Sequence, residues 1–230
     1  SGAHRVELCS NLNIGGTTPS RGLIELAKEN LSIEIYVMVR PRGGDFCYSG
    51  LEFEVMKRDI KNAKKMKVDG VVLGILKPNG QIDVPRMREL IQIAHPLKIT
   101  FHRAFDKSRD LFESLDTLID LGVERILTSG GEDKAINGVD TIRELVCRAD
   151  ERIIIMPGSG VNIDNIRQII EDTGVKEIHL SARKKEDSKM TYRNLKINSG
   201  GKIVISEHEI FFASEDIIKE ISNELKKYRK

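Results

Sequence analysis

Short apolar segments recur along this chain at intervals of about 25 to 37 residues, and amphipathic helical patterns separate them. Strands that alternate with helices build βαβ units, whose strands lie in one parallel sheet. Seven such segments in one chain predict a closed (β/α) barrel, in which the C-terminal ends of the strands carry the chemistry. The segments are Arg5–Cys9, Ile33–Arg40, Gly70–Leu76, Lys98–Arg103, Arg125–Gly130, Arg152–Gly160 and Glu177–Arg183.

The length of 230 residues predicts one barrel domain over residues 1–230, because such barrels commonly need about 200–250 residues. A closed barrel needs eight strands, and the residues before Arg5 resemble the end of a helix with a glycine cap. We therefore expect an α/β protein with a TIM-type (β/α)8 barrel whose first βα unit is missing at the N-terminus.

The pattern changes after Arg183, where a charged and turn-rich stretch begins. Two short apolar runs, Ile203–Ser206 and Glu209–Ala213, predict a hairpin. A last amphipathic helix, from about Glu215 to Tyr228, would close the barrel.

The composition excludes several classes of protein. A net charge of +2 argues against nucleic-acid binding through a basic surface, and no apolar run approaches the length of a membrane span. Three cysteines without a CxxC pair do not form a disulfide framework, which favours a reducing, cytoplasmic location. The chain also lacks the HExxH, GxSxG and P-loop motifs of familiar hydrolases.

Alternation along the strands places polar side chains on the face opposite the apolar one, near the strand ends. Burial of charged groups there costs free energy unless the charges are paired, so their presence indicates a function or a set of ion pairs. We expect a pocket in which Glu7, His102 and His179 are candidate acid–base groups. The candidate ligand-binding side chains are Arg40, Arg42, Ser181 and Arg183. The alternative is a structural layer of salt bridges, such as Glu7 with Arg40.

Two glycine loops follow strands and precede helices. Ser129 and Gly130 belong to one loop, and Gly158 and Gly160 to the other. Backbone amides at such positions attract anions, and late-strand loops of barrels often hold phosphate. The alternative is that the glycines simply permit tight turns.

Two of the cysteines are candidates for metal binding. Cys9 lies at the end of a strand, on the face that we expect to point inward, and Cys47 lies in the loop after the next strand. A pair of soft thiolates could bind Cu(I), with a methionine or histidine nearby. The alternative is that both are small buried apolar residues. No organic cofactor is indicated.

Several of these segments resemble the CutC copper homeostasis family over nearly the whole chain. They are Arg5–Cys9, Gly15–Ser20, Arg40–Phe46, Thr100–Asp106, Ile126–Gly130, Met156–Gly160, His179–Arg183 and Lys189–Asn194. The resemblance implies a TIM-type barrel, a cytosolic protein that forms homo-oligomers, and a link to copper tolerance and Cu(I) binding. Cys9 occupies a cysteine position of the family motif, whereas Cys47 occupies a position that is apolar in many relatives.

Three hypotheses for function follow. The first is copper homeostasis through Cu(I) bound by Cys9, with Cys47 as a second ligand. The second is a metal-independent enzyme that acts on a small anionic or sugar-like substrate in the pocket of Glu, His and Arg side chains. The third is a binding barrel without catalysis. Neither nucleic acid nor a membrane is an expected partner.

Overall fold

The computed structural model of the chain describes residues 2–194 and 208–228. They form two compact units, one of residues 3–180 and the other of the described residues from 181 onward together with Gly2. Each unit is described by itself below.

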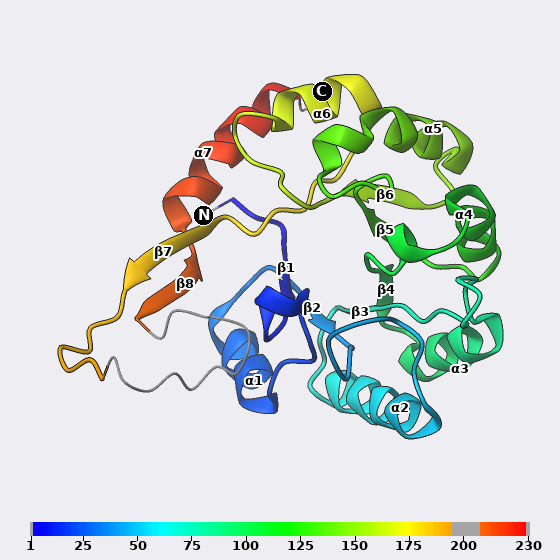
Figure 1. The fold of residues 1–230 in the computed structure, drawn as a ribbon, viewed down its shortest axis with the longest axis horizontal. Coiled ribbons are helices and arrows are strands. Elements are labelled where there is room, and N and C mark those ends of the chain that lie inside the picture. The colour runs from blue at the N-terminus through cyan, green and yellow to red at the C-terminus, as the bar shows by residue number, and fades with distance from the viewer. Residues whose placement is uncertain (1, 195–207, 229–230) are drawn as a thin grey trace. The chain divides into compact units, whose positions relative to one another are not determined.

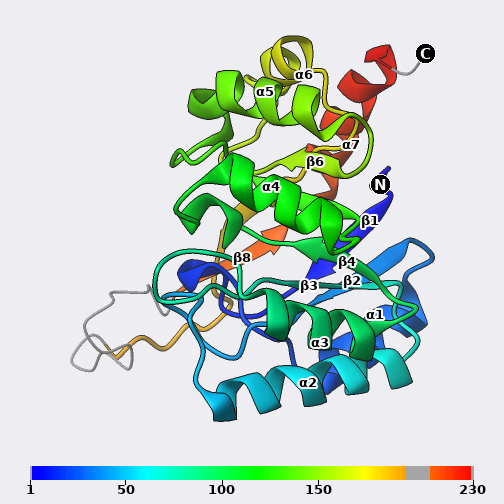
Figure 2. The same cartoon turned by 90° about the vertical axis from the view of Figure 1, so that its right-hand side faces the viewer.

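The larger unit is a curled sheet of six parallel strands with helices along its outer side (Figures 1 and 2). The strands pair in chain order, as expected when each is joined to the next by a helix. They are β1 (Arg5–Leu8), β2 (Glu34–Met38), β3 (Gly70–Leu73), β4 (Lys98–Phe101), β5 (Arg125–Thr128) and β6 (Ile154–Pro157). This half-barrel confirms the predicted TIM-type fold.

The helices alternate with the strands, as the amphipathic patterns between the apolar segments predict. They are α1 (Arg21–Asn30), α2 (Gly50–Lys65), α3 (Val84–Ala94), α4 (Leu111–Asp120), α5 (Val139–Ala149) and α6 (Ile166–Thr173), with short 3₁₀ turns η1 (Leu12–Ile14), η2 (Phe105–Lys107) and η3 (Ala135–Gly138). Capping residues in the local sequence determine where several of these helices begin. For example, Ser49 and Glu52 form a reciprocal capping box at the start of α2.

The core of this unit lies between the sheet and the helices. Ile35, Val71 and Phe101 project from neighbouring strands and are fully buried. Burial of such apolar side chains contributes about 25 cal/mol per Å² of area removed from water. The opposite face of the sheet carries the polar residues, so the alternation of the strands places them as the sequence predicts.

The chain after α6 differs from the prediction in one respect. Residues 177–182 are not a strand, although the N–H of His179 donates to the carbonyl of Pro157, 2.9 Å away. Ala182 has a left-handed φ of 45°, which interrupts the extended run before Arg183. The predicted strand Glu177–Arg183 is therefore wrong.

Instead, β7 (Arg183–Asp187) pairs in antiparallel fashion with β8 (Glu209–Ala213). The predicted strand Glu209–Ala213 is confirmed, although its partner is β7. The other predicted strand of the hairpin, Ile203–Ser206, lies outside the described residues. The last helix is present as α7 (Glu215–Leu225), followed by the 3₁₀ turn η4 (Lys226–Tyr228).

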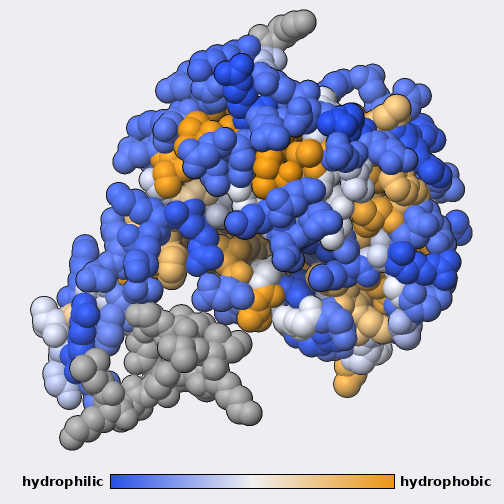
Figure 3. Space-filling model, turned by 45° about the horizontal axis from the view of Figure 1, so that its top comes forward, coloured by the Kyte–Doolittle hydropathy of each residue, from blue (hydrophilic) through white to orange (hydrophobic). Residues whose placement is uncertain are grey.

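The surface in Figure 3 is mostly polar, with apolar side chains in small groups between charged ones. In the described part of the chain, no helix is both long and apolar enough to cross a membrane.

Candidate functional site

The deepest polar layer on the inner face of the sheet is an ion network. The carboxylate of Glu177 accepts from Arg125 at 2.6 and 2.9 Å and from Arg5 at 2.7 Å. Both guanidinium groups also lie over the ring of Tyr36, at 5.0 Å for Arg5 and 5.6 Å for Arg125. The sequence analysis considered such a layer for Glu7 and Arg40. The structure builds it from other residues, nearer the N-terminal ends of the strands.

The network also shifts the ionisation of Glu177. Burial acts to raise the pKa of this carboxyl, but the hydrogen bonds from Arg125 and Arg5, together with their charges, outweigh burial and lower it. Glu177 therefore stays ionised, and the layer ties β1 and β5 to the segment after α6.

Glu7 lies beyond this network toward the strand ends and is joined to it only by a long ion pair with Arg5. Its side chain is 6% exposed, and neither carboxylate oxygen has a hydrogen-bond partner among the described residues. The nearest basic groups are Nδ1 of His179 at 3.4 Å and Nε of Arg5 at 3.9 Å. A buried carboxylate without hydrogen bonds is costly, so it marks a place where a donor or a cation would be stabilised.

Cys9 lies one residue past the end of β1 and two residues after Glu7. It is half-buried and packs against the buried cluster of Tyr36, Met38 and Val72. Burial raises the pKa of the Cys9 thiol, and the negative charge of Glu7 raises it further. The thiol is thus held protonated at neutral pH until something stabilises the thiolate.

Arg40 has a structural task at the end of β2. Its guanidinium donates to the carbonyls of Ile14 and Gly16, at 2.8 and 2.9 Å, and to the carbonyl of Gly44 at 2.7 Å. It also stacks on Phe46 at 4.8 Å. Arg40 therefore holds the loops after β1 and β2 together, and only its Nε lacks a partner among the described residues.

His102 is a buried neutral imidazole rather than a group that titrates near neutral pH. Burial, followed by the positive charge of Arg40, lowers the pKa of His102 to about 3. Its Nδ1 accepts from the N–H of Ala104 at 3.2 Å, so Nε2 carries the proton. The role of His102 as an acid–base group stays a prediction, and the deep burial of the ring, which the sequence does not reveal, opposes its protonation near neutral pH.

The glycine loop after β5 already holds an anion, which is the carboxylate of Asp106. The N–H groups of Ser129 and Gly131 donate to it at 3.0 and 3.2 Å, and Nε of Arg103 donates at 2.7 Å. The N–H of Gly130 donates instead to the Thr128 hydroxyl. Ser129 and Gly130 were predicted to bind an external anion, but the structure shows their loop satisfied from within.

The second glycine loop has steric reasons for its glycines. A Cβ on Gly158 would lie 2.5 Å from a methyl carbon of Leu127. Gly160 has a φ of 70°, and a Cβ there would lie 3.1 Å from the side chain of Lys134. These contacts explain both residues without a ligand, and an anion-binding role for them stays a prediction.

Arg42 and Cys47 belong to the loop after β2. Arg42 donates to Glu52 at 2.6 Å and to Asp45 at 2.9 Å, so it braces this loop against α2. The carbonyl of Cys47 accepts from Arg42, and its N–H donates to Asp45. A pairing of Cys47 with Cys9 stays a prediction.

Ser181 and Arg183 lie in the smaller unit, where Arg183 stacks on Phe211 at 4.3 Å. The third cysteine, Cys147, is exposed on α5.

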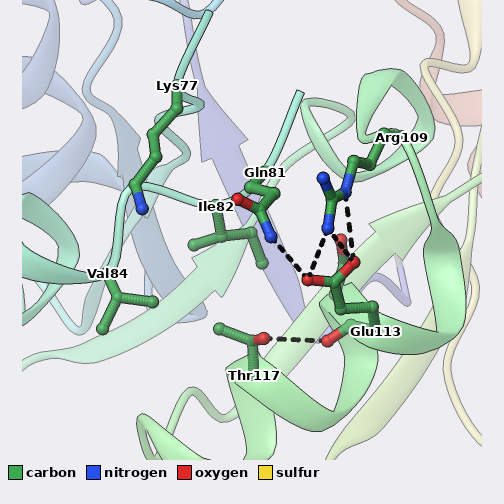
Figure 4. Close-up of a pocket in the computed structure, with 8 residues that line it drawn as sticks. Lys77, Gln81, Ile82, Val84, Arg109, Glu113 and Thr117 are labelled. Atoms are coloured by element: carbon green, nitrogen blue, oxygen red, sulfur yellow. Dashed lines mark hydrogen bonds and ion pairs between the residues drawn. The ribbon is translucent and has the colours of Figure 1, made fainter. Parts of the chain in front are cut away.

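The described residues contain no cluster of three or more His, Cys, Asp or Glu side chains that could hold a metal ion. A small cavity of about 100 Å³ lies elsewhere, between the turn after β3 and the start of α4. Figure 4 shows Gln81 and Arg109 converging there on Glu113. These contacts pair the charges of Arg109 and Glu113, and none of the predicted site residues lines the cavity.

The sequence analysis missed Asp106 and Met38 as parts of the strand-end region. Asp106 ends the segment Thr100–Asp106, and the length of that segment was a signal of a special role. The loop that its carboxylate binds begins 22 residues later in the sequence, so the contact itself could not be predicted. Met38 alternates with Glu34, Tyr36 and Arg40 on the inward face of the same strand. An apolar residue among polar ones on that face was the signal that could have identified Met38.

The fold and the site together define a parallel (β/α) half-barrel protein with a buried carboxylate and a thiol at its strand ends. The model of the CutC family matches residues 1–184, and the chain belongs to this family. A CutC family protein from Parabacteroides distasonis is 52% identical over 219 residues, which are 95% of this chain and 90% of that protein. The human copper homeostasis protein cutC homolog is 46% identical over 209 residues, which are 91% of this chain and 77% of that protein.

Solved structures give the same result for the fold. CutC from Streptococcus agalactiae superposes with a TM-score of 0.74 at 43% identity, over 76% of this chain and 87% of that one. Deoxyribose phosphate aldolase from Aeropyrum pernix has a TM-score of 0.53 at 13% identity, over 68% of this chain and 67% of that one, and shows only the shared fold.

Proposed function

We propose that this protein acts in copper homeostasis by binding Cu(I) through the Cys9 thiolate. The observation that carries the proposal is the position of Cys9, which lies half-buried at the end of β1 near the carboxylate of Glu7, which has no hydrogen bond among the described residues. Cu(I) prefers soft thiolate and thioether ligands, and a nearby negative charge stabilises a cation. The names of relatives from human and mouse, which refer to copper homeostasis, support the same role.

Cu(I) binding at Cys9 displaces a proton from the thiol. Since burial and Glu7 raise the pKa of Cys9, the thiol is mostly protonated at neutral pH. Metal binding that must release a proton strengthens as the pH rises. Apparent Cu(I) affinity should therefore increase with pH until the pKa of Cys9 is passed.

The test is an anaerobic Cu(I) titration against a competing chelator. The wild type should bind one Cu(I) per chain, and Cys9→Ser should abolish competition with the chelator. Cys147→Ser is the matched control, because Cys147 is exposed on α5 and should leave binding unchanged. Cys47→Ser decides whether the second cysteine contributes. Cu(I) binding that is indifferent to Cys9→Ser would refute the proposal.

The location and assembly of the protein are proposals as well. All three cysteines are free, which suits a reducing cytoplasm. The apolar side chains of Ile210, Phe211 and Phe212 on β8 are exposed by 38 to 52%, which supports association of copies of the chain. Light scattering on the purified protein measures its assembly directly.

A further inference from the structure

We propose that the thioether of Met38 is the second Cu(I) ligand, facing the Cys9 thiolate across a gap that Gly16 keeps open. This inference rests on the proposed function and names the chemistry of that same site. It assigns a role to a buried methionine on the otherwise polar inner face of β2.

The geometry around Gly16 brings the two sulfur-bearing side chains together. A Cβ built on Gly16 would lie 3.5 Å from Sγ of Cys9 and 3.5 Å from the terminal methyl carbon of Met38. Those two atoms therefore lie no more than about 7 Å from each other. Gly16 has a φ of 86°, which favours glycine, so no side chain fills the gap.

The backbone of Met38 is held in place by strand pairing, while the end of its side chain can change conformation. Its side chain is 8% exposed and packs with Tyr36 and Val72, and its backbone is paired with Val72 of β3. Methionine has three rotatable bonds and no branch, so a change of rotamer can bring its sulfur to the side that its methyl now faces. The thioether can therefore turn toward Cys9 without movement of the strand.

The charge beside this gap favours a monovalent cation. Glu7 is nine-tenths buried, and its carboxylate lacks hydrogen bonds within the described residues. It is close enough to Cys9 for its charge to act on the thiol. A Cu(I) ion between Cys9 and Met38 would add a positive charge near this carboxylate, whose ion pair with Arg5 is long, at 3.9 Å.

The two sulfur ligands proposed here favour Cu(I) over Zn(II). Zn(II) usually takes four ligands in protein sites, and the described residues offer no cluster of three or more His, Cys, Asp or Glu side chains. A thiolate with a thioether suits Cu(I), which is soft. Unlike the thiol, the thioether does not compete with protons, so it adds affinity at every pH.

The experiment compares Met38→Leu, Met56→Leu and Cys9→Ser in the anaerobic Cu(I) titration. Met38→Leu keeps the volume and the apolar character of the side chain, so the fold should persist. It should weaken Cu(I) binding by about 10- to 100-fold, as removal of a partner in a metal site commonly does. Met56→Leu is the matched control, because Met56 is fully buried on α2 and should leave binding unchanged.

A second measurement detects the bond itself. Selenium-edge X-ray absorption of the Cu(I)-loaded, selenomethionine-labelled protein should show a copper neighbour, and Met38→Leu should remove it. Circular dichroism of each variant confirms that the fold is intact.

The outcomes separate the two proposals. If Cys9→Ser abolishes binding while Met38→Leu behaves like Met56→Leu and the selenium spectrum shows no copper, the role of Met38 is refuted and Cys9 stands. If the wild type does not bind Cu(I), or Cys9→Ser binds equally well, the proposed function fails and the role of Met38 fails with it.

Discussion

Glu7 lies on β1, Cys9 directly follows that strand, and the charge of Glu7 acts on the Cys9 thiol. Glu7 is buried without a hydrogen-bond partner among the described residues, and its charge contributes to the raised pKa of the Cys9 thiol. Alternation along the strand was enough to predict that both face inward. The absence of hydrogen bonds to Glu7 could not be predicted, because it depends on side chains from distant strands.

The substitution Glu7→Gln tests this coupling. Removal of the charge should lower the pKa of Cys9, because burial alone then opposes thiolate formation. Alkylation of Cys9 at a fixed pH near 8 should become several-fold faster, as followed by mass spectrometry of its peptide. Alkylation of the exposed Cys147 in the same sample is the internal control. An unchanged rate at Cys9 would show that the two side chains are not coupled.

At the scale of elements, the strands and helices were predictable, whereas the loops that follow the strands were not. Apolar periodicity located β1–β6 and the helices between them. The same periodicity misplaced a strand over Glu177–Arg183, because alternation alone does not show whether a neighbouring strand is there to pair. The loop after β5 resembled an anion site, and the structure fills it with Asp106.

The substitution Asp106→Asn tests whether this carboxylate holds the loop. Its side chain is 2% exposed and accepts from Arg103, Ser129 and Gly131, so loss of the charge leaves the guanidinium of Arg103 and the backbone donors poorly satisfied. The free energy of unfolding should fall by about 2 to 4 kcal/mol, as measured by urea titration.

Asp110→Asn is the matched control for this experiment. Asp110 caps the start of α4 by accepting from the N–H groups of Phe112 and Glu113, and asparagine caps helices about equally well. That variant should be nearly neutral. A loss below about 0.5 kcal/mol in Asp106→Asn would contradict the structural role of the carboxylate.

At the scale of the whole molecule, stability should depend on pH through His102 and Glu177. The pKa of His102 is about 3 in the folded chain, against an ordinary value of 6.5, so below pH 6.5 the unfolded chain binds a proton that the folded chain does not. Stability is therefore lost as the pH falls from about 6.5 toward 3, by up to about 1.4 kcal/mol per pH unit from this group.

Glu177 acts in the same direction. Its pKa is lowered in the folded chain, so its stabilisation is complete above the unfolded pKa and is lost as the pH falls through the folded value. Urea unfolding at pH 5 and pH 7 should show a lower free energy at pH 5. An NMR titration should show the His102 imidazole still neutral at pH 5. Protonation of His102 near pH 6.5 would contradict its burial as a neutral ring.

The central claim is that Cys9 holds copper at the strand ends, and anomalous diffraction tests it most directly. Crystals of the full chain loaded with one equivalent of Cu(I) without oxygen would be measured on both sides of the copper absorption edge. The account predicts one anomalous peak within bonding distance of Sγ of Cys9, absent in Cys9→Ser. A peak at another site, or none beside Cys9 in crystals that contain copper, would contradict it.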